Sequence, residues 1–227
     1  WNDDAVNATH LAWFLSALAL LYYALRRYLS RMWSLFGIYA IVSMPLYLMH
    51  GTNTYADIFM GTHVFAAIIL LFHAIRSENP GTRDAFLRMS AVATALLPFT
   101  KNEGLLLYLP PILLIVTGYL FMQRRNMTAR DISRTALWYA ISMLLVLVPW
   151  LAYKYANGLT FGNAKAVGDL AFGWQKGVLY AVMVNTFFEG NWILLFPVFA
   201  TLLAWRRRAA FTTLLPLTAL FLIVYLV

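Results

Sequence analysis

The sequence predicts an all-α membrane protein, a polytopic bundle of about eight transmembrane helices with an external interfacial helix. Of its 227 residues 62% are hydrophobic and only 11% are charged, which is too little polar surface for a soluble globular domain of this size. Apolar runs of roughly 15 to 20 residues recur along the chain, about the length that crosses a hydrocarbon core at 1.5 Å per helical residue. Short strands of alternating polarity, the pattern of a membrane β-barrel, are absent from the sequence.

The individual elements follow from these apolar runs. The expected crossings are residues 11–25, 32–49, 58–75, 85–100, 105–122, 137–153, 192–205 and 209–227. The stretch 174–188 is also apolar, but the charges on either side leave room for one crossing only, so it is the expected interfacial helix. We expect one transmembrane domain over 1–227. Because there is no initial methionine and the last apolar run reaches the final residue, we expect a fragment that lacks the first helix and the C-terminal part.

The two kinds of basic residue separate between alternate loops. The loops after the first, third, fifth and seventh runs contain all the arginines except Arg88, which lies one turn inside the fourth run and can snorkel to the same side. All four lysines fall in the other loops. The positive-inside rule then predicts cytoplasmic arginine loops in a protein of the plasma (inner) membrane. The net charge of +8 comes from short clusters at the ends of apolar runs, so no nucleic-acid partner is expected.

The external loops supply the candidate functional residues. Carboxylates near a low-dielectric boundary can act as general bases, and a lysine beside them can hold a phosphate. The candidate catalytic residues are Asp3, Asp4 and Asp57, the candidate phosphate-binding residue is Lys101, and the supporting residues are Glu103, His50 and Tyr55. Simpler explanations exist for the two best placed of them: helix capping for Asp57, which opens a span, and helix-end snorkelling for Lys101.

Metal and cofactor sites are not predicted. The chain has no cysteine, which removes disulfides and thiolate ligands from consideration. His63 and His73 each lack a partner one helical turn away, so a packed or hydrogen-bonded histidine is expected at both positions. Dependence on a divalent metal stays open.

Short motifs occur in order between residues 24 and 116. They are Tyr28-Leu29-Ser30-Arg31 leading into an apolar span, Pro45, Tyr55-Ala56-Asp57 opening the next span, and Thr100-Lys101-Asn102-Glu103-Gly104-Leu105 after the following one. In this order and topology the chain resembles membrane glycosyltransferases of the GT-C superfamily. The likeness is to the bacterial branch related to protein mannosyltransferases and lipid A aminoarabinose transferases.

The resemblance implies transfer of a sugar, with inversion, from a polyprenyl-phosphate donor to a lipid, protein or glycan acceptor on the external face of the membrane. It implies Lys101 as the partner of the donor phosphate, Asp3 or Asp4 as the general base, and Asp57 and Glu103 as residues that orient the substrate or Lys101. The members of the family have a transmembrane helix before the first external loop, so the base can also lie upstream of Trp1.

Two other functions fit the same composition. A transporter or flippase of a lipid-linked substrate would also use kinked helices around a cavity, although transporters usually place ionisable residues near the middle of the membrane. A non-catalytic membrane subunit would tolerate replacement of the acidic residues and lysines. The central parts of the spans carry almost no ionisable residues, with His63 the nearest exception, and this favours an enzyme acting at the membrane surface.

Overall fold

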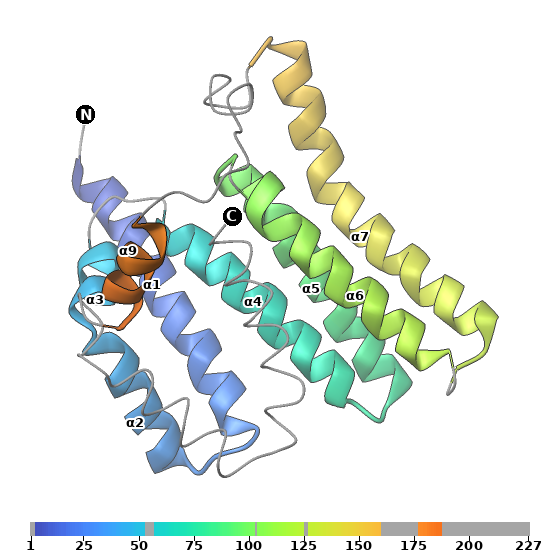
Figure 1. The fold of residues 1–227 in the computed structure, drawn as a ribbon, viewed down its shortest axis with the longest axis horizontal. Coiled ribbons are helices and arrows are strands. Elements are labelled where there is room, and N and C mark those ends of the chain that lie inside the picture. The colour runs from blue at the N-terminus through green and yellow to red at the C-terminus, as the bar shows by residue number, and fades with distance from the viewer. Residues whose placement is uncertain (1–2, 53–56, 103, 125–126, 160–176, 188–227) are drawn as a thin grey trace. The chain divides into compact units, whose positions relative to one another are not determined.

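The computed structural model describes residues 3–52, 57–102, 104–124, 127–159 and 177–187. This part of the chain is helical throughout and contains no strand (Figure 1). The helices are α1 (Asp3–Arg26), α2 (Arg31–Val42), α3 (Pro45–Thr52), α4 (Asp57–Arg76), α5 (Pro80–Thr100), the π-helix η1 (Gly104–Tyr108), α6 (Leu109–Gln123), α7 (Ala129–Ala156) and α9 (Val178–Phe187). The predicted all-α class is therefore confirmed.

Three of the described helices are long and apolar enough to cross a membrane. They are Val6–Arg26, Asp57–Arg76 and Ala129–Ala156, and they contain the predicted runs 11–25, 58–75 and 137–153. The chain is thus consistent with a membrane protein. The runs 192–205 and 209–227 lie outside the described residues, and the count of about eight crossings stays a prediction. The stretch 174–188 contains α9, but its interfacial position also stays a prediction.

The predicted run 32–49 is not one helix. It is divided into α2 and α3 at Pro45, which has no N–H to continue the hydrogen bonds of α2 and whose ring would clash with the carbonyl one turn earlier. The last turn of α2 tightens instead, with the Met44 N–H donating to the Ile41 carbonyl at 3.1 Å. Pro45 then begins α3, the helix position where a missing N–H does no harm.

The chain forms two compact units. The first unit contains α1, α2, α3 and α9 together with Asp57 and Ile58, and the second unit runs from Phe59 through α7. In the first unit α1 packs on α2 and α3. The rings of Phe14 and Tyr47 are 5.6 Å apart, and Gly51 lies so close to the Phe14 ring that a side chain there would overlap it. The single transmembrane domain stays a prediction.

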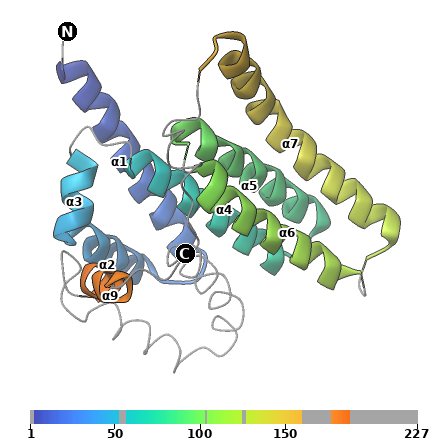
Figure 2. The same cartoon turned by 45° about the horizontal axis from the view of Figure 1, so that its top comes forward.

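The second unit is organised around α5. One face of α5 is lined with small side chains, among them Ala91 and Ala95, which are fully buried. Trp150 and Leu147 of α7 pack against Ala95, so α5 and α7 lie side by side (Figure 2). Small residues of this kind let helix backbones approach closely in a membrane, where dispersion contacts replace the hydrophobic effect as the main attraction between helices.

Buried hydroxyl groups also join the helices of the second unit. The Ser90 hydroxyl of α5 donates to the Ala67 carbonyl of α4 at 2.8 Å. The Thr94 hydroxyl donates to the Ser90 carbonyl at 2.7 Å and lies 3.3 Å from the Tyr139 hydroxyl of α7. Since the single Thr94 proton is used within α5, Tyr139 is the donor to Thr94. Polar contacts thus link α4, α5 and α7 in the interior of the unit.

The two ends of the second unit carry different charges. Arginines lie at the end where α4 and α6 finish and α5 and α7 begin; they are Arg76, Arg83, Arg88, Arg124, Arg130 and Arg134. We call this the arginine end. At the opposite end Lys101 and Asn102 follow the last residue of α5, and Lys154 lies in the last turn of α7. We call these three residues the lysine end.

Candidate functional site

The lysine end is shaped by the tight turn between α5 and η1. Lys101 caps the C-terminus of α5 with an extended backbone, and its N–H donates to the Leu97 carbonyl at 3.1 Å. The next hydrogen bonds run from the Gly104 N–H to the Lys101 carbonyl and from the Leu105 N–H to the Asn102 carbonyl, at 2.9 and 3.0 Å. The backbone of the predicted motif is therefore fixed on both sides of Lys101, whose side chain is half-buried.

Gly104 explains why this turn can be so close to α5. A Cβ atom at this position would overlap the carbonyl group of Leu97 and would lie 2.8 Å from the nitrogen of Pro98. Only glycine permits this approach of two backbones. The following five residues form the π-helix η1, and π-helical turns are frequent at functional sites.

Lys154 joins α7 to the same turn. Its ammonium donates a hydrogen bond to the side-chain oxygen of Asn102 at 2.7 Å, which is a short, charge-assisted bond. The same ammonium lies 5.0 Å from the centre of the Trp150 ring, one helical turn earlier, within the range of a cation–π contact. Because Lys101 is the chain neighbour of Asn102, two lysine side chains arise from one small region at the end of the unit.

A second polar contact, near the lysine end, joins α4 to the last turn of α5. His63 of α4 is buried, and its Nδ1 lies 3.0 Å from the Thr100 hydroxyl of α5. The Thr100 hydroxyl donates its only proton to the Leu96 carbonyl at 2.8 Å. His63 must therefore donate from Nδ1, which leaves Nε2 as the acceptor atom of the neutral ring. As predicted, His63 is a packed, hydrogen-bonded histidine.

The first unit contains a histidine–carboxylate pair. His50 lies in the last turn of α3 and Asp57 is the first residue of α4. The His50 Nδ1 is 4.0 Å from the Asp57 Oδ2, and the two side chains are 31% and 48% exposed. The sequence predicted both residues as parts of a site. The structure brings their side chains within the range of an ion pair.

The structure describes only some of the remaining predicted residues. Asp3 and Asp4 lie in the first turn of α1, whereas Tyr55 and Glu103 lie outside the described residues. Lys101 belongs to the second unit, at its lysine end. No group of three or more histidine or acidic side chains placed to hold a metal occurs in the described ranges, and dependence on a metal stays open.

Two contacts of these regions were not predicted from the sequence. The bond between Lys154 and Asn102 joins residues 52 positions apart, and that between His63 and Thr100 joins residues 37 positions apart. Each partner could be noticed as a polar side chain near the end of an apolar run. Their pairing follows only from the antiparallel packing of the helices.

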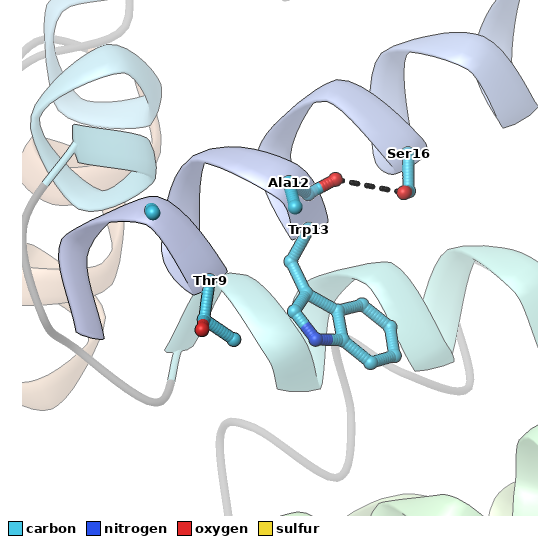
Figure 3. A pocket seen from close by; sticks show the side chains of 5 residues that line it. Thr9, Ala12, Trp13 and Ser16 are labelled. Atoms are coloured by element: carbon cyan, nitrogen blue, oxygen red, sulfur yellow. Dashed lines mark hydrogen bonds between the residues drawn. The ribbon is translucent and has the colours of Figure 1, made fainter. Parts of the chain in front are cut away.

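A shallow groove of about 410 Å³ lies along α1. It is lined by Ala8, Thr9, Ala12, Trp13 and Ser16, and the Ser16 hydroxyl donates to the Ala12 carbonyl at 2.7 Å (Figure 3). Ala8, Ala12 and Ser16 are each four residues apart, the spacing at which small side chains line one helix face. The groove contains none of the candidate residues.

Comparison with protein-family models, with curated proteins and with solved structures found no match to this chain.

Proposed function

We propose that this membrane protein is an inverting glycosyltransferase, which moves a sugar from a polyprenyl-phosphate donor to a lipid, protein or glycan acceptor. In this proposal the reaction takes place at the external face of the plasma (inner) membrane, the arginine loops are cytoplasmic, and the lysine end of the second unit binds the donor phosphate. The reaction class is suggested by the motifs between residues 24 and 116, which resemble those of GT-C glycosyltransferases.

The observation that carries the proposal is the hydrogen bond between Lys154 and Asn102. At 2.7 Å it fixes the ammonium of one lysine beside the turn that bears the other, Lys101. A lipid phosphate is a compact anion that resides at the membrane interface, and ammonium groups at the ends of membrane helices lie at the same depth. Two lysines near one turn suit such a headgroup better than either lysine alone.

The proposed reaction also requires cations beside the donor phosphate. As the acceptor oxygen bonds to the anomeric carbon, the bond from that carbon to the phosphate oxygen breaks, and polyprenyl phosphate leaves with the electron pair. The negative charge on the phosphate grows during this step. An ammonium that contacts the phosphate stabilises that charge and so lowers the barrier.

The acidic candidates keep their proposed roles. Asp3 and Asp4 are candidates for the base that deprotonates the acceptor, and Asp57 and Glu103 are candidates for orienting the substrate. A transporter or flippase is less well supported, because several described interior contacts of the second unit are made by the uncharged hydroxyl groups of Ser90, Thr94 and Tyr139. The buried histidines His63 and His73 are exceptions. Coupled transporters usually carry ionisable side chains near the middle of the membrane.

The test uses the purified full-length protein in lipid vesicles with a polyprenyl-phosphate donor carrying a radiolabelled sugar. We expect transfer by the unchanged protein, and a loss of at least about tenfold in turnover for Lys101→Ala and Asp57→Asn. Arg134→Ala removes an exposed cation from the arginine end and is the matched control, with an expected rate close to that of the unchanged protein.

Other outcomes separate the alternatives. Movement of the donor across the vesicle membrane without release of polyprenyl phosphate would support the flippase. Full activity of both Lys101→Ala and Asp57→Asn would refute the assignment of these residues. No transfer and no movement by the unchanged protein, with any donor, would favour the non-catalytic subunit.

A further inference from the structure

We propose that Arg88 and Trp138 form a binding site for the phosphate of an anionic phospholipid, in the leaflet of the membrane that surrounds the arginine end. Both residues belong to the second unit, Arg88 on α5 and Trp138 on α7. The site lies at the end of the unit opposite to the proposed donor site. A lipid bound here is a structural ligand and not a substrate, so the site does not depend on the glycosyltransferase chemistry.

The two side chains are in contact on the surface of the second unit. The guanidinium carbon of Arg88 lies 4.8 Å from the centre of the Trp138 ring, within the range of a cation–π contact. Arg88 is exposed and Trp138 is 40% exposed, so the pair is open to a ligand from outside. A guanidinium stacked on a ring keeps the N–H groups at its edge for other partners, and these groups match the oxygens of a phosphate.

The charge of Arg88 is not neutralised within the described part of the chain. The nearest carboxylate in the sequence is that of Asp84, one helical turn earlier, but its Oδ1 lies 3.5 Å from the Nε of Arg83. Arg88 itself makes no ion pair with a described residue. A charged side chain on the surface of a membrane helix is costly without a counter-ion. The phosphate of a lipid would supply that counter-ion.

The direction of the helices brings the pair toward the lipid headgroups. Arg88 and Trp138 are the ninth and tenth residues of α5 and α7, which both begin at the arginine end, and long side chains incline toward the N-terminus of their helix. The 28 residues of α7 span about 42 Å, more than a hydrocarbon core of roughly 30 Å. The pair therefore falls near the interface, where tryptophan is enriched and arginine reaches the phosphates.

Buried contacts between α5 and α7 hold the pair in place. Tyr139, the chain neighbour of Trp138, has its hydroxyl 3.3 Å from that of Thr94 on α5. One turn and a half beyond Arg88, the fully buried Ala95 packs against α7. The two helices therefore keep one register in this region, and the positions from which the guanidinium and the indole extend are fixed before any lipid binds. Such preorganisation lowers the entropic cost of binding.

Apolar side chains beside the pair distinguish a lipid from a free phosphate. Val92 lies one turn beyond Arg88 on α5, and Leu145 lies two turns beyond Trp138 on α7, both on the side toward the lysine end. Both are exposed. An acyl chain can pack against them while its phosphate contacts the guanidinium, and this burial of apolar surface is a contact that a soluble anion would lack.

The charge of the arginine end favours an anionic lipid over a zwitterionic one. Among the described residues this end has six arginines and three acidic residues, Glu78, Asp84 and Asp131, which gives a net charge of +3. A positive surface at the membrane interface attracts acidic headgroups. Phosphatidylglycerol has a phosphate and no ammonium, so it suits this end better than phosphatidylcholine, whose ammonium group would be repelled.

The test is a titration of the purified full-length protein in detergent with phosphatidylglycerol, in which native mass spectrometry gives the lipid-bound fraction. Arg88→Ala should weaken binding at least about tenfold, because it removes the charged hydrogen-bond donors. Trp138→Leu keeps the cation and an apolar side chain but removes the ring, and should weaken binding about three- to tenfold. Phosphatidylcholine should bind the unchanged protein more weakly than phosphatidylglycerol.

The matched control is Arg130→Ala. It removes the same charge from an exposed position at the same end, two helical turns before Trp138, and binding should stay within about twofold of the unchanged protein. Circular dichroism and elution from a sizing column should show that all three variants remain folded, and Arg88→Gln replaces Arg88→Ala if the latter does not.

A second measurement needs no variant. A phosphatidylglycerol with a photoreactive diazirine in its headgroup should crosslink to the unchanged protein within residues 84–92 of α5 or 134–142 of α7. Crosslinks that fall only in other parts of the chain would overturn the site.

Three results of the titration would also overturn the proposal. Equal binding by Arg88→Ala and the unchanged protein would remove the guanidinium from the site. Equal losses for Arg88→Ala and Arg130→Ala would show a general attraction between the arginine end and acidic lipids. Displacement of the lipid by millimolar inorganic phosphate would show a site for a soluble anion.

Discussion

The ammonium of Lys154 donates a 2.7 Å hydrogen bond to the Asn102 side chain and thereby ties the end of α7 to the turn that follows α5. This bond crosses between two helices and has a charged donor. Hydrogen bonds of this kind contribute about 1.5–3 kcal/mol to stability. The contact therefore contributes to the stability of the fold, and in the proposed phosphate site it also positions Lys154.

Asn102→Ala should lower the free energy of unfolding by about 1–3 kcal/mol, because it leaves the Lys154 ammonium without this acceptor. Unfolding in mixed detergent micelles, followed by circular dichroism, gives the value. The control is Asn157→Ala, since Asn157 is exposed and its amide donates to the Tyr153 carbonyl of its own helix at 2.8 Å. Equal losses for the two variants would contradict a special role for the contact between helices.

Gly104→Ala should disrupt the turn, because the added Cβ would overlap the Leu97 carbonyl and the Pro98 nitrogen. We expect a clear fall in thermal stability in detergent together with a loss of donor binding. Gly118→Ala is the matched control in α6, where a Cβ meets nothing within 4 Å. It should be neutral or stabilising by up to about 1 kcal/mol, since alanine favours the helix. Similar melting temperatures for both variants would argue against the close approach.

Tyr139→Phe should lower the free energy of unfolding by about 0.5–1.5 kcal/mol, because it removes the hydroxyl that donates to Thr94 between α7 and α5. The measurement is the same unfolding experiment. Tyr153→Phe on the same helix is the control, since Tyr153 is 63% exposed and its replacement should leave stability unchanged. A neutral result for Tyr139→Phe would show that the buried hydroxyls do not contribute to helix association.

Single-cysteine labelling should show the two ends of the second unit on opposite sides of the membrane. The chain has no native cysteine, so Glu78→Cys, between α4 and α5, and Asn157→Cys, at the end of α7, each give one reactive site. In intact cells a membrane-impermeant maleimide should label Asn157→Cys, and it should label Glu78→Cys only after permeabilisation. The opposite result would reverse the predicted orientation, and labelling of both from outside would contradict the crossing.

The hydropathy of the sequence located the helices well where one apolar run corresponds to one unbroken helix. The runs at 11–25, 58–75 and 137–153 lie within α1, α4 and α7. The prediction of one helix over 32–49 is wrong, because average hydropathy does not register that Pro45 interrupts the backbone hydrogen bonds. The π-helical turn after Gly104 was missed for a related reason: a change in hydrogen-bond register leaves the composition of a run unchanged.

The sequence indicates single polar residues more readily than the contacts between them. Asp57 and Lys101 could be selected as candidates because they stand where apolar runs begin or end. The contacts of Lys154 with Asn102 and of His63 with Thr100 depend on which helices pack side by side. That choice is made by small residues on α5 and by shape complementarity, which no local pattern encodes.

The π-helical turn at Gly104–Tyr108 also sets the rotational phase of the helix that follows it. Such a turn holds one residue more than an α-helical turn, and each residue added to or removed from a helix rotates everything beyond it by about 100°. Deleting one residue from η1 would therefore swing the buried side of α6, which includes Ile112 and Val116, away from its present neighbours. The number of residues in η1 therefore fixes the rotation of α6 about its axis, and insertions or deletions within η1 would be tolerated far less than substitutions.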